Sequence, residues 1–214
     1  MNQINKTISR GPGRRPADST SELDLKILAT AESLFSNQGF AATSIRQIAD
    51  QAMVNPALVH YYFGNKKELL NTVLQRVLEP MAAGIAALPD DLDHFLEALL
   101  NVLFDNLAAH PDLARLLVRE GLLPGGAFQQ EFATRFAPRL GGALPPRFKA
   151  LQDKGQLHAS HHPGICALHM IALCAFPFLA HDLATAKLEV DFSGPGIEIL
   201  KQQTLRLLRE GYQV

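Results

Sequence analysis

The chain has 214 residues, of which 47% are hydrophobic and 19% charged, and its formal net charge at pH 7 is −1. This composition is typical of globular proteins and excludes a chain that is disordered throughout. The longest weakly polar run, residues 165–180, is 16 residues long, shorter than the ~20 apolar residues that cross a bilayer. No apolar stretch follows Lys6 and Arg10 near the start of the chain. We therefore expect no secretory signal, no membrane partner and a cytoplasmic protein.

Charge is distributed unevenly along the chain. Residues 1–76 hold nine lysines and arginines against six acids, a net of +3, which leaves 11 basic and 15 acidic groups, a net of −4, for the other 138 residues. A basic front indicates either a polyanionic partner or a solubilising tail. Glycines and prolines interrupt residues 1–20, which predicts a flexible basic arm. Its arginines, Arg10, Arg14 and Arg15, either enter a DNA minor groove or only keep the chain soluble.

Three helices are predicted in the segment that follows. Apolar residues recur at three- and four-residue steps from residue 21 to a stop at Gly39. A short helix then spans residues 43–52, with Thr43 as its cap, and a third spans residues 56–62, with Pro56 in its first turn. A longer helix followed by two short ones predicts a helix-turn-helix, in which the second short helix would lie in a DNA major groove.

A fourth helix connects this module to the rest of the chain. It begins at Lys66 after the cap residue Asn65, and Pro80 should kink or end it. Beyond it, no sustained alternation of polar and apolar residues indicates a strand. The sequence therefore predicts an all-α fold whose further helices span residues 91–109, 111–121, 127–155 with an interruption near 141–146, 163–183 and 195–212.

Two stretches carry a resemblance to a known family: GFAATSIRQIA at residues 39–49 and VNPALVHYYFGNKKELL at residues 54–70. Together they resemble the signature of the TetR (tetracycline-repressor) family over about residues 22–70. The resemblance implies a three-helix DNA-binding domain at residues 21–66, joined by a connecting helix to a larger helical ligand-binding and dimerisation domain at residues 67–214. It also implies a homodimer that binds double-stranded DNA at a palindromic operator and that an unidentified small-molecule effector releases.

Residues that match the family's motif are expected to contact DNA. Pro56 begins the presumed recognition helix, where small or apolar side chains suit thymine methyl groups. Arg46 would reach a guanine or a phosphate, although a solvated arginine is the alternative. The expected contacts are Thr43, Ser44, Arg46, Asn55, Pro56, Ala57, Leu58, His60, Tyr61, Tyr62 and Lys66.

Some of these positions have a second interpretation or depart from the family pattern. Thr43 is either a phosphate contact or only a helix cap. Lys66 would hold a phosphate beside the free N–H groups at a helix start. His60 stands where the family frequently has tyrosine, and it would bind phosphate better when protonated, so binding should weaken as pH rises. Met53 replaces a glycine frequent in the turn, and its Cβ disfavours a left-handed conformation.

The larger domain is expected to enclose the effector and to form the dimer. The resemblance implies a cavity between its helices and pairing of two copies through helices 163–183 and 195–212. Most large apolar residues there must form the core, and we expect the cavity to be lined by Phe95, Leu99, Phe104, Leu116, Phe132 and Phe176.

No motif indicates enzyme or metal chemistry. The chain lacks a Gly-x-Ser-x-Gly motif and a phosphate-binding glycine loop, and Cys166 and Cys174 form no Cys-x-x-Cys pattern. The histidines between His158 and His181 show no metal-binding spacing. We expect no catalytic residue, no cofactor and no metal. The alternative is an all-helical small-molecule-binding module or enzyme without DNA binding. A salt-dependent shift of a duplex carrying an inverted repeat would separate the two.

Overall fold

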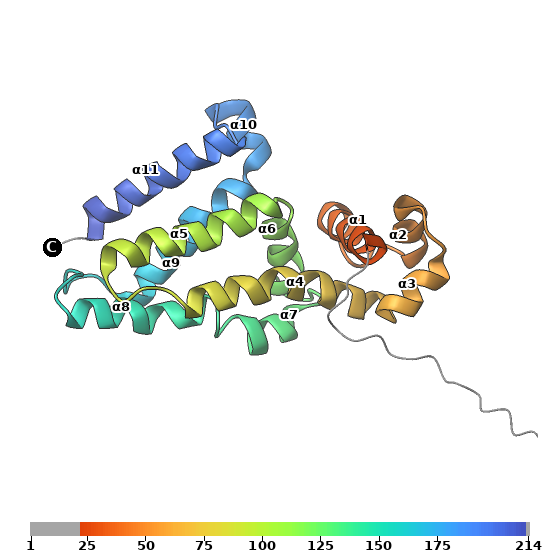
Figure 1. The fold of residues 1–214 in the computed structure, drawn as a ribbon, viewed down its shortest axis with the longest axis horizontal. Helices are drawn as coiled ribbons and strands as arrows, with labels where there is room; N and C mark the ends of the chain where they lie inside the picture. The colour runs from red at the N-terminus through yellow and green to blue at the C-terminus, as the bar shows by residue number, and fades with distance from the viewer. Residues whose placement is uncertain (1–21, 213–214) are drawn as a thin grey trace, which may run out of the picture.

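The computed structural model describes residues 22–212, which form helices and turns and contain no strand. Figure 1 shows a small N-terminal body and a larger C-terminal body joined by helix α4, which belongs to both. The small body contains helices α1 (Glu22–Gln38), α2 (Ile45–Ala52) and α3 (Pro56–Phe63), and α4 spans Lys66–Ala86. The basic arm expected at residues 1–20 lies outside the described residues.

Local interactions explain where the short helices begin. Ser44, and not Thr43 as expected, is the N-cap of α2: its Oγ accepts a hydrogen bond from the N–H of Gln47, while the Gln47 side chain accepts one from the N–H of Ser44. This reciprocal pair is a capping box. Asn55 caps α3, and Pro56 occupies its first position, where a missing N–H has no cost. The predicted helices are therefore present, with the start of the second shifted by two residues.

Helix α4 does not end at Pro80. The helix continues to Ala86, so of the two outcomes expected at Pro80, a kink or an end, the end is excluded. Proline removes one backbone hydrogen bond from a helix interior, but Pro80 lies on the exposed side of α4. Buried residues on the other side, among them Val77 and Ile85, keep the helix packed. Tertiary packing outweighs the local cost here.

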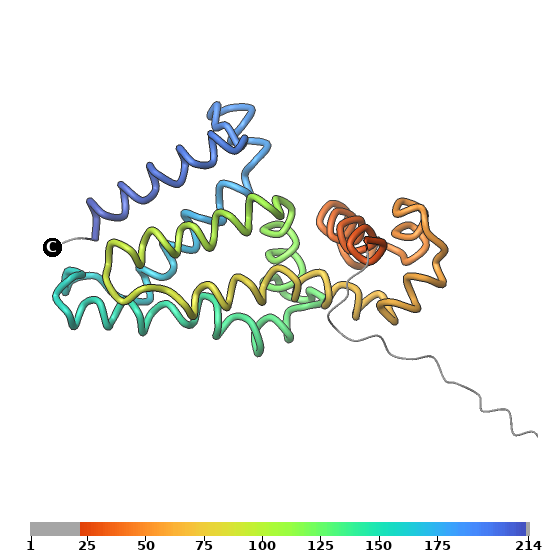
Figure 2. The backbone as a smooth tube through the Cα atoms, viewed as in Figure 1, coloured from red at the N-terminus to blue at the C-terminus, as the bar shows by residue number. Residues whose placement is uncertain are grey.

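The larger body is a bundle built around α4, α5 and α9. Helix α8 packs against α9, and α11 packs against α5, which also contacts α4 and α9. Figure 2 shows the backbone of the last helix along one side of this bundle. Its elements are α5 (Leu92–Ala109), α6 (Leu113–Leu116), the π-helix η1 (Leu117–Leu122), α7 (Gln129–Glu131), the π-helix η2 (Phe132–Phe136), the 3₁₀ turn η3 (Gly141–Ala143), α8 (Leu144–Asp153), α9 (Pro163–Leu179), α10 (His181–Leu188) and α11 (Gly194–Tyr212).

Two of the predicted helices in this body are divided. The helix expected at residues 111–121 is a short α-helix followed by η1, a π-helix with a wider turn. The helix expected at residues 163–183 is α9 followed by α10, with a bend of 75° between them. Within residues 22–212, no single helix is long and apolar enough to cross a membrane, and only the bent α9–α10 pair reaches that length and composition.

Candidate nucleic-acid interface and ligand cavity

The turn between α2 and α3 holds the two helices in the arrangement of a helix-turn-helix. Met53 ends α2 in a left-handed conformation, with φ of 56° and ψ of 44°. A Cβ makes this conformation costly, so the sequence correctly identified an unusual position. The Met53 N–H still donates to carbonyls of α2, and its side chain is exposed. The departure from glycine therefore leaves the turn intact.

Helix α3 carries six of the eleven residues expected to contact DNA, and three of the six are on its exposed face. Ala57, His60 and Tyr61 are exposed, whereas Val59 faces the core. The rings of Tyr61 and Tyr62 meet edge to face, with centroids 5.2 Å apart. Pro56, Leu58 and Tyr62 are half-buried. The sequence did not indicate which of the two tyrosines is exposed. In the structure Tyr61 points outward and Tyr62 packs against the protein.

One ring nitrogen of His60 forms a hydrogen bond within the protein. Its Nδ1 lies 2.7 Å from the carbonyl oxygen of Gly64. A carbonyl oxygen only accepts, so Nδ1 carries a proton and donates it to this end of α3. The other nitrogen, Nε2, can donate to a phosphate only when the ring is doubly protonated. This geometry supplies the reason for the expected loss of phosphate binding at higher pH.

Helix α2 adds an exposed basic group beside this face. The Arg46 side chain is 86% exposed, and its Nε lies 4.0 Å from Asp50 one turn along the helix. Such a contact between exposed side chains contributes little energy, so the guanidinium can turn to another partner. Ser44 is exposed as well, but its hydroxyl caps α2 and contacts the Gln47 side chain.

Two residues expected to contact phosphate have internal roles. The Thr43 side chain is buried, and its hydroxyl donates to the carbonyl of Gly39 at 2.8 Å. The Lys66 ammonium donates to the carbonyls of Phe40 and Thr43, both at 2.8 Å. It also lies 4.3 Å from the centre of the Phe40 ring, a cation–π contact. Lys66 therefore ties the start of α4 to the α1–α2 loop.

The N–H groups expected to be free at the start of α4 are also occupied. Asn65 Oδ1 accepts hydrogen bonds from the N–H groups of Lys67 and Glu68, at 2.9 and 3.0 Å. A phosphate beside Lys66 would need those donors, and the Asn65 side chain already occupies them. Lys67, which is exposed, is the ammonium group that this end of α4 presents to solvent.

A buried glutamate connects the two bodies, and the sequence analysis missed it. Glu120, on η1, is 6% exposed. One of its carboxylate oxygens accepts from the N–H of Phe40 in the α1–α2 loop at 3.0 Å, and the other accepts from the N–H of Ala127 at 3.0 Å. A glutamate in a helical stretch looks like a solvated residue in sequence, so no pattern indicated this role.

Further contacts join the same surfaces. Arg119 Nη1 lies 3.4 Å from the carbonyl oxygen of Ser36, and a Cβ at Gly39 would approach the same nitrogen to 3.2 Å. Gly39 also has a φ of 89°, so both its backbone conformation and the close approach of Arg119 favour glycine at this position. In addition, His110 Nδ1 donates to a carboxylate oxygen of Glu32 on α1 at 3.0 Å. The N-terminal body is therefore held against η1 and the end of α5.

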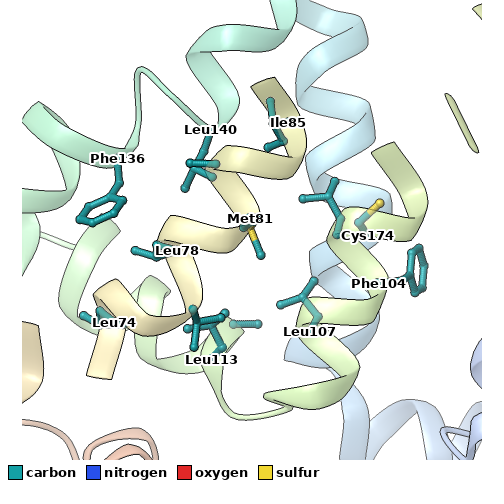
Figure 3. Close-up of a cluster of buried hydrophobic side chains, with 14 of the residues drawn as sticks. Leu74, Leu78, Met81, Ile85, Phe104, Leu107, Leu113, Phe136, Leu140 and Cys174 are labelled. Atoms are coloured by element: carbon teal, nitrogen blue, oxygen red, sulfur yellow. The ribbon is translucent and has the colours of Figure 1, made fainter. Parts of the chain in front are cut away.

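The larger body contains a cavity of about 330 Å³. Met81 of α4, Leu107 of α5 and Cys174 of α9 line it, and Figure 3 shows these residues among the buried side chains around it. Leu117 and Val118 of η1 form another wall. The full lining is Met81, Ile85, Leu103, Leu107, Ala114, Leu117, Val118, Leu122, Phe132, Ala137, Leu140, Gly141, Gly142, Leu144, Ile171, Cys174, Ala175 and Leu179.

Of the six residues expected to line the cavity, Phe132 does so. Phe95, Leu99, Phe104 and Leu116 are fully buried and belong to the surrounding core. Phe95 packs on Phe148, and Phe104 packs on Phe178, with ring centroids 5.2 and 5.9 Å apart. Phe176 is 65% exposed on α9. Core and cavity walls use the same residue types, so composition did not separate them.

The described residues, 22–212, contain no group of three or more histidine, cysteine or carboxylate side chains placed to hold a metal ion. Cys166 and Cys174 are both buried free thiols. Burial raises the pKa of Cys174 to about 12, and it also raises the pKa of Cys166. Both thiols are therefore protonated near neutral pH.

Comparison with known proteins identifies the family. Residues 27–73 match the family model of bacterial regulatory proteins, tetR family. The chain is 30% identical to the HTH-type transcriptional repressor NicS of Pseudomonas putida over 204 aligned positions, and the match covers 87% of this chain and 93% of NicS. The chain belongs to the TetR family. It is accordingly a helix-turn-helix transcriptional regulator, as the motif at residues 39–70 indicated.

Other TetR-family matches differ in how much of each chain they cover. The HTH-type transcriptional repressor SCO4008 of Streptomyces coelicolor is 36% identical over 116 residues, which are 51% of this chain and 58% of that repressor. The solved structure of the regulator KstR2 of Mycobacterium tuberculosis covers 94% of the chain with a TM-score of 0.71 and 17% identity. A SmeT–triclosan complex covers 91% with a TM-score of 0.63 and 20% identity. These structural similarities establish the fold of both bodies.

Proposed function

We propose that this chain is a homodimeric repressor that binds a palindromic operator and releases it when a small molecule fills the cavity. Residues 21–66 form the DNA-binding domain, and residues 67–214 bind the ligand and the second subunit. The observation that carries the proposal is the double role of η1, which lines the cavity with Leu117 and Val118 and holds the α1–α2 loop through Glu120. The NicS and SCO4008 relatives are repressors, and the SmeT relative was solved with triclosan.

The exposed face of α2 and α3 supports the DNA-binding part. We assign base contacts to the first turn of α3, where Ala57 is exposed beside half-buried Pro56 and Leu58. Arg46 reads a guanine or contacts a phosphate from α2, and Tyr61 and protonated His60 contact phosphates. Asn55 and Ser44 fix the starts of the two helices that present these groups.

An exposed apolar face on α9 supports dimerisation. Ile165, Leu168, Ala172 and Phe176 recur at three- and four-residue steps on α9 and are all exposed in the single chain. Further large apolar residues are exposed on α11, for example Leu207. Covering such a face with a second copy removes it from water. A two-fold pairing would place the two α3 helices in successive major grooves, about 34–36 Å apart.

Regulation then follows from the shared segment. A ligand that pushes on Leu117 and Val118 displaces η1, and Glu120 and Arg119 carry that displacement to the α1–α2 loop. The two α3 helices of a dimer bind one duplex only at a fixed spacing, so a change in that spacing releases DNA. To shift the ratio of DNA-competent to released dimers from 99:1 to 1:99, the ligand must bind the released form about 5.5 kcal/mol more tightly. By reciprocity, bound DNA must lower the affinity for the ligand by the same free energy.

Selection of duplexes from a random pool, followed by fluorescence anisotropy over a range of salt concentrations, tests this function. We expect an inverted-repeat site, two chains per duplex and an affinity that falls steeply as salt rises. Arg46→Ala should cost about 1–3 kcal/mol at one G·C pair if the guanidinium reads guanine. Equal losses on selected and scrambled duplexes would assign Arg46 to phosphate. Failure of the pool to yield any enriched sequence would overturn operator binding itself.

A further inference from the structure

The cavity described above offers a ligand no charged, hydroxyl or amide side chain. Every side chain that lines it is a hydrocarbon or a sulfur-containing side chain, and Gly141 and Gly142 contribute backbone. The only lining group with a dissociable proton is the Cys174 thiol. Burial raises its pKa to about 12, so it is a neutral and weakly hydrogen-bonding wall at physiological pH. It is not a thiolate that could bind a cation or attack an electrophile.

Charged residues near the cavity are engaged elsewhere. Glu120 accepts from two backbone N–H groups, and Arg119 lies against the carbonyl of Ser36. On the outer side of α4, Glu79 pairs with Arg135 and Arg139, at 2.7 and 2.8 Å. None of these charged groups lines the cavity. An ionic ligand would therefore lose its hydration without gaining a counter-charge, which is strongly unfavourable.

The size of the cavity limits the ligand further. An engineered apolar cavity of ~150 Å³ binds benzene, and the volume here is about 330 Å³, roughly twice as large. The lining includes exposed residues, Leu122 of η1 with Ile171 and Leu179 of α9, which mark an opening on one side. A molecule of about two rings therefore fits the interior and can enter without unfolding the bundle.

We propose that the cavity binds a neutral, apolar compound of about two rings, or a branched hydrocarbon of similar volume, that lacks any carboxylate, phosphate or ammonium group. This inference rests on the proposed function, because it names the ligand class of the same cavity. Recognition is by shape and burial of apolar surface. The walls come from α4, α5, α6, η1, η2, η3, α8 and α9, and η1 contributes three of the lining residues, Leu117, Val118 and Leu122.

A matched pair of fluorescent probes tests the ligand class on the full chain without DNA. N-phenyl-1-naphthylamine is neutral, and 8-anilino-1-naphthalenesulfonate has the same ring system with an added sulfonate. We expect the neutral probe to bind at least about 100-fold more tightly, because the sulfonate finds no partner in the cavity. Similar affinities for the two probes would overturn the proposal.

Cavity-filling variants locate the bound probe. Ala175→Phe on α9 and Leu117→Phe on η1 enlarge two lining residues from different elements. The matched control is Ala83→Phe, which adds the same ring at an exposed position of α4. Each filled variant should weaken the neutral probe by about tenfold or more, and the control should not change it. Far-ultraviolet circular dichroism and a cooperative urea transition confirm that a variant is folded. Unchanged probe affinity in both folded, filled variants would place the probe outside the cavity and refute the inference.

The two proposals fail in different ways. If the neutral probe binds in the cavity but leaves operator affinity unchanged, the ligand class is supported and ligand-controlled release is refuted. If the chain binds operator but the neutral probe has no advantage over its sulfonate, the ligand class is refuted and the DNA-binding function is not.

Discussion

Glu120→Gln is the sharpest test of the connection between the cavity and the DNA-binding domain. In the native protein each carboxylate oxygen accepts one backbone N–H, from Phe40 and from Ala127, both at 3.0 Å. An amide of the same shape keeps one acceptor and places an NH₂ donor against the other N–H. One buried N–H then has no partner, which costs about 1–3 kcal/mol. We expect the free energy of unfolding to fall by that amount.

Urea denaturation measures the loss. With a slope of about 3 kcal/mol per molar urea, the midpoint should fall by roughly 0.3–1 M. Glu131→Gln is the matched control, because Glu131 is a more exposed carboxylate paired with Arg135 on the adjacent surface at 3.2 Å. That pair should contribute only a few tenths of a kcal/mol. If the two variants are equally stable, the two backbone contacts of Glu120 do not hold the domains together.

The same variant separates a structural role from a regulatory one. Glu120→Gln leaves the outer face of α2 and α3 unaltered, so it should still bind operator. Because the contact between the α1–α2 loop and η1 is weakened, N-phenyl-1-naphthylamine should release less DNA from this variant than from the native protein. The readout is operator anisotropy at saturating probe. An undiminished response would show that the signal passes through another contact, such as the one between His110 and Glu32.

Four further outcomes are expected. Lys66→Ala should lower the free energy of unfolding by about 1–3 kcal/mol and leave the salt slope of DNA binding unchanged. Lys67→Ala should leave the free energy of unfolding unchanged and reduce the salt slope by about 0.9. A slope reduced by about 0.9 in Lys66→Ala would instead show that Lys66 contacts a phosphate. His60→Ala should weaken operator and scrambled duplexes alike, because it removes a phosphate contact and reads no base; an unchanged affinity would exclude that contact. Leu168→Glu should sediment as a monomer if α9 forms the dimer; a dimer would place the interface elsewhere. Because the pKa of Cys174 is raised to about 12, its stabilising effect is full below about pH 8.5 and is lost as pH rises toward 12, so Cys174→Ala should show a shallower alkaline decline in melting temperature.

The sequence predicted the N-terminal domain well because its signals are local. Asn55 and Pro56 determine the start of α3 through a cap and a fixed φ, and Gly39 ends α1 through a positive φ. Errors arose where a distant contact decided the outcome. Lys66 looks like a surface lysine at a helix start, but its ammonium reaches the carbonyl of Phe40, 26 residues earlier in the chain. No local pattern contains that information.

In the larger domain, the sequence predicted the presence of helices better than their faces. Phe104 and Leu107 lie on one helix, three residues apart, and Figure 3 shows them on different sides of it. Phe104 packs on Phe178, whereas Leu107 lines the cavity. Both are buried apolar residues, and hydrophobic periodicity reports burial without saying whether a neighbour or a void lies opposite. The same limit explains why Phe95 and Leu116 were expected in a cavity that they only surround.

The π-helical form of η1 gives a physical reason why a single short segment can contact both the ligand cavity and the DNA-binding domain. A π-helix has more residues per turn than an α-helix and is frequently found at functional sites. In η1, Leu117, Val118 and Leu122 face the cavity, while Arg119 and Glu120 between them contact the other domain. Five of its six residues thus contact either the cavity or the DNA-binding domain. Because these residues share one short segment, a displacement of the cavity wall would also displace the groups that hold the α1–α2 loop, so the proposed coupling requires no long chain of intermediate residues.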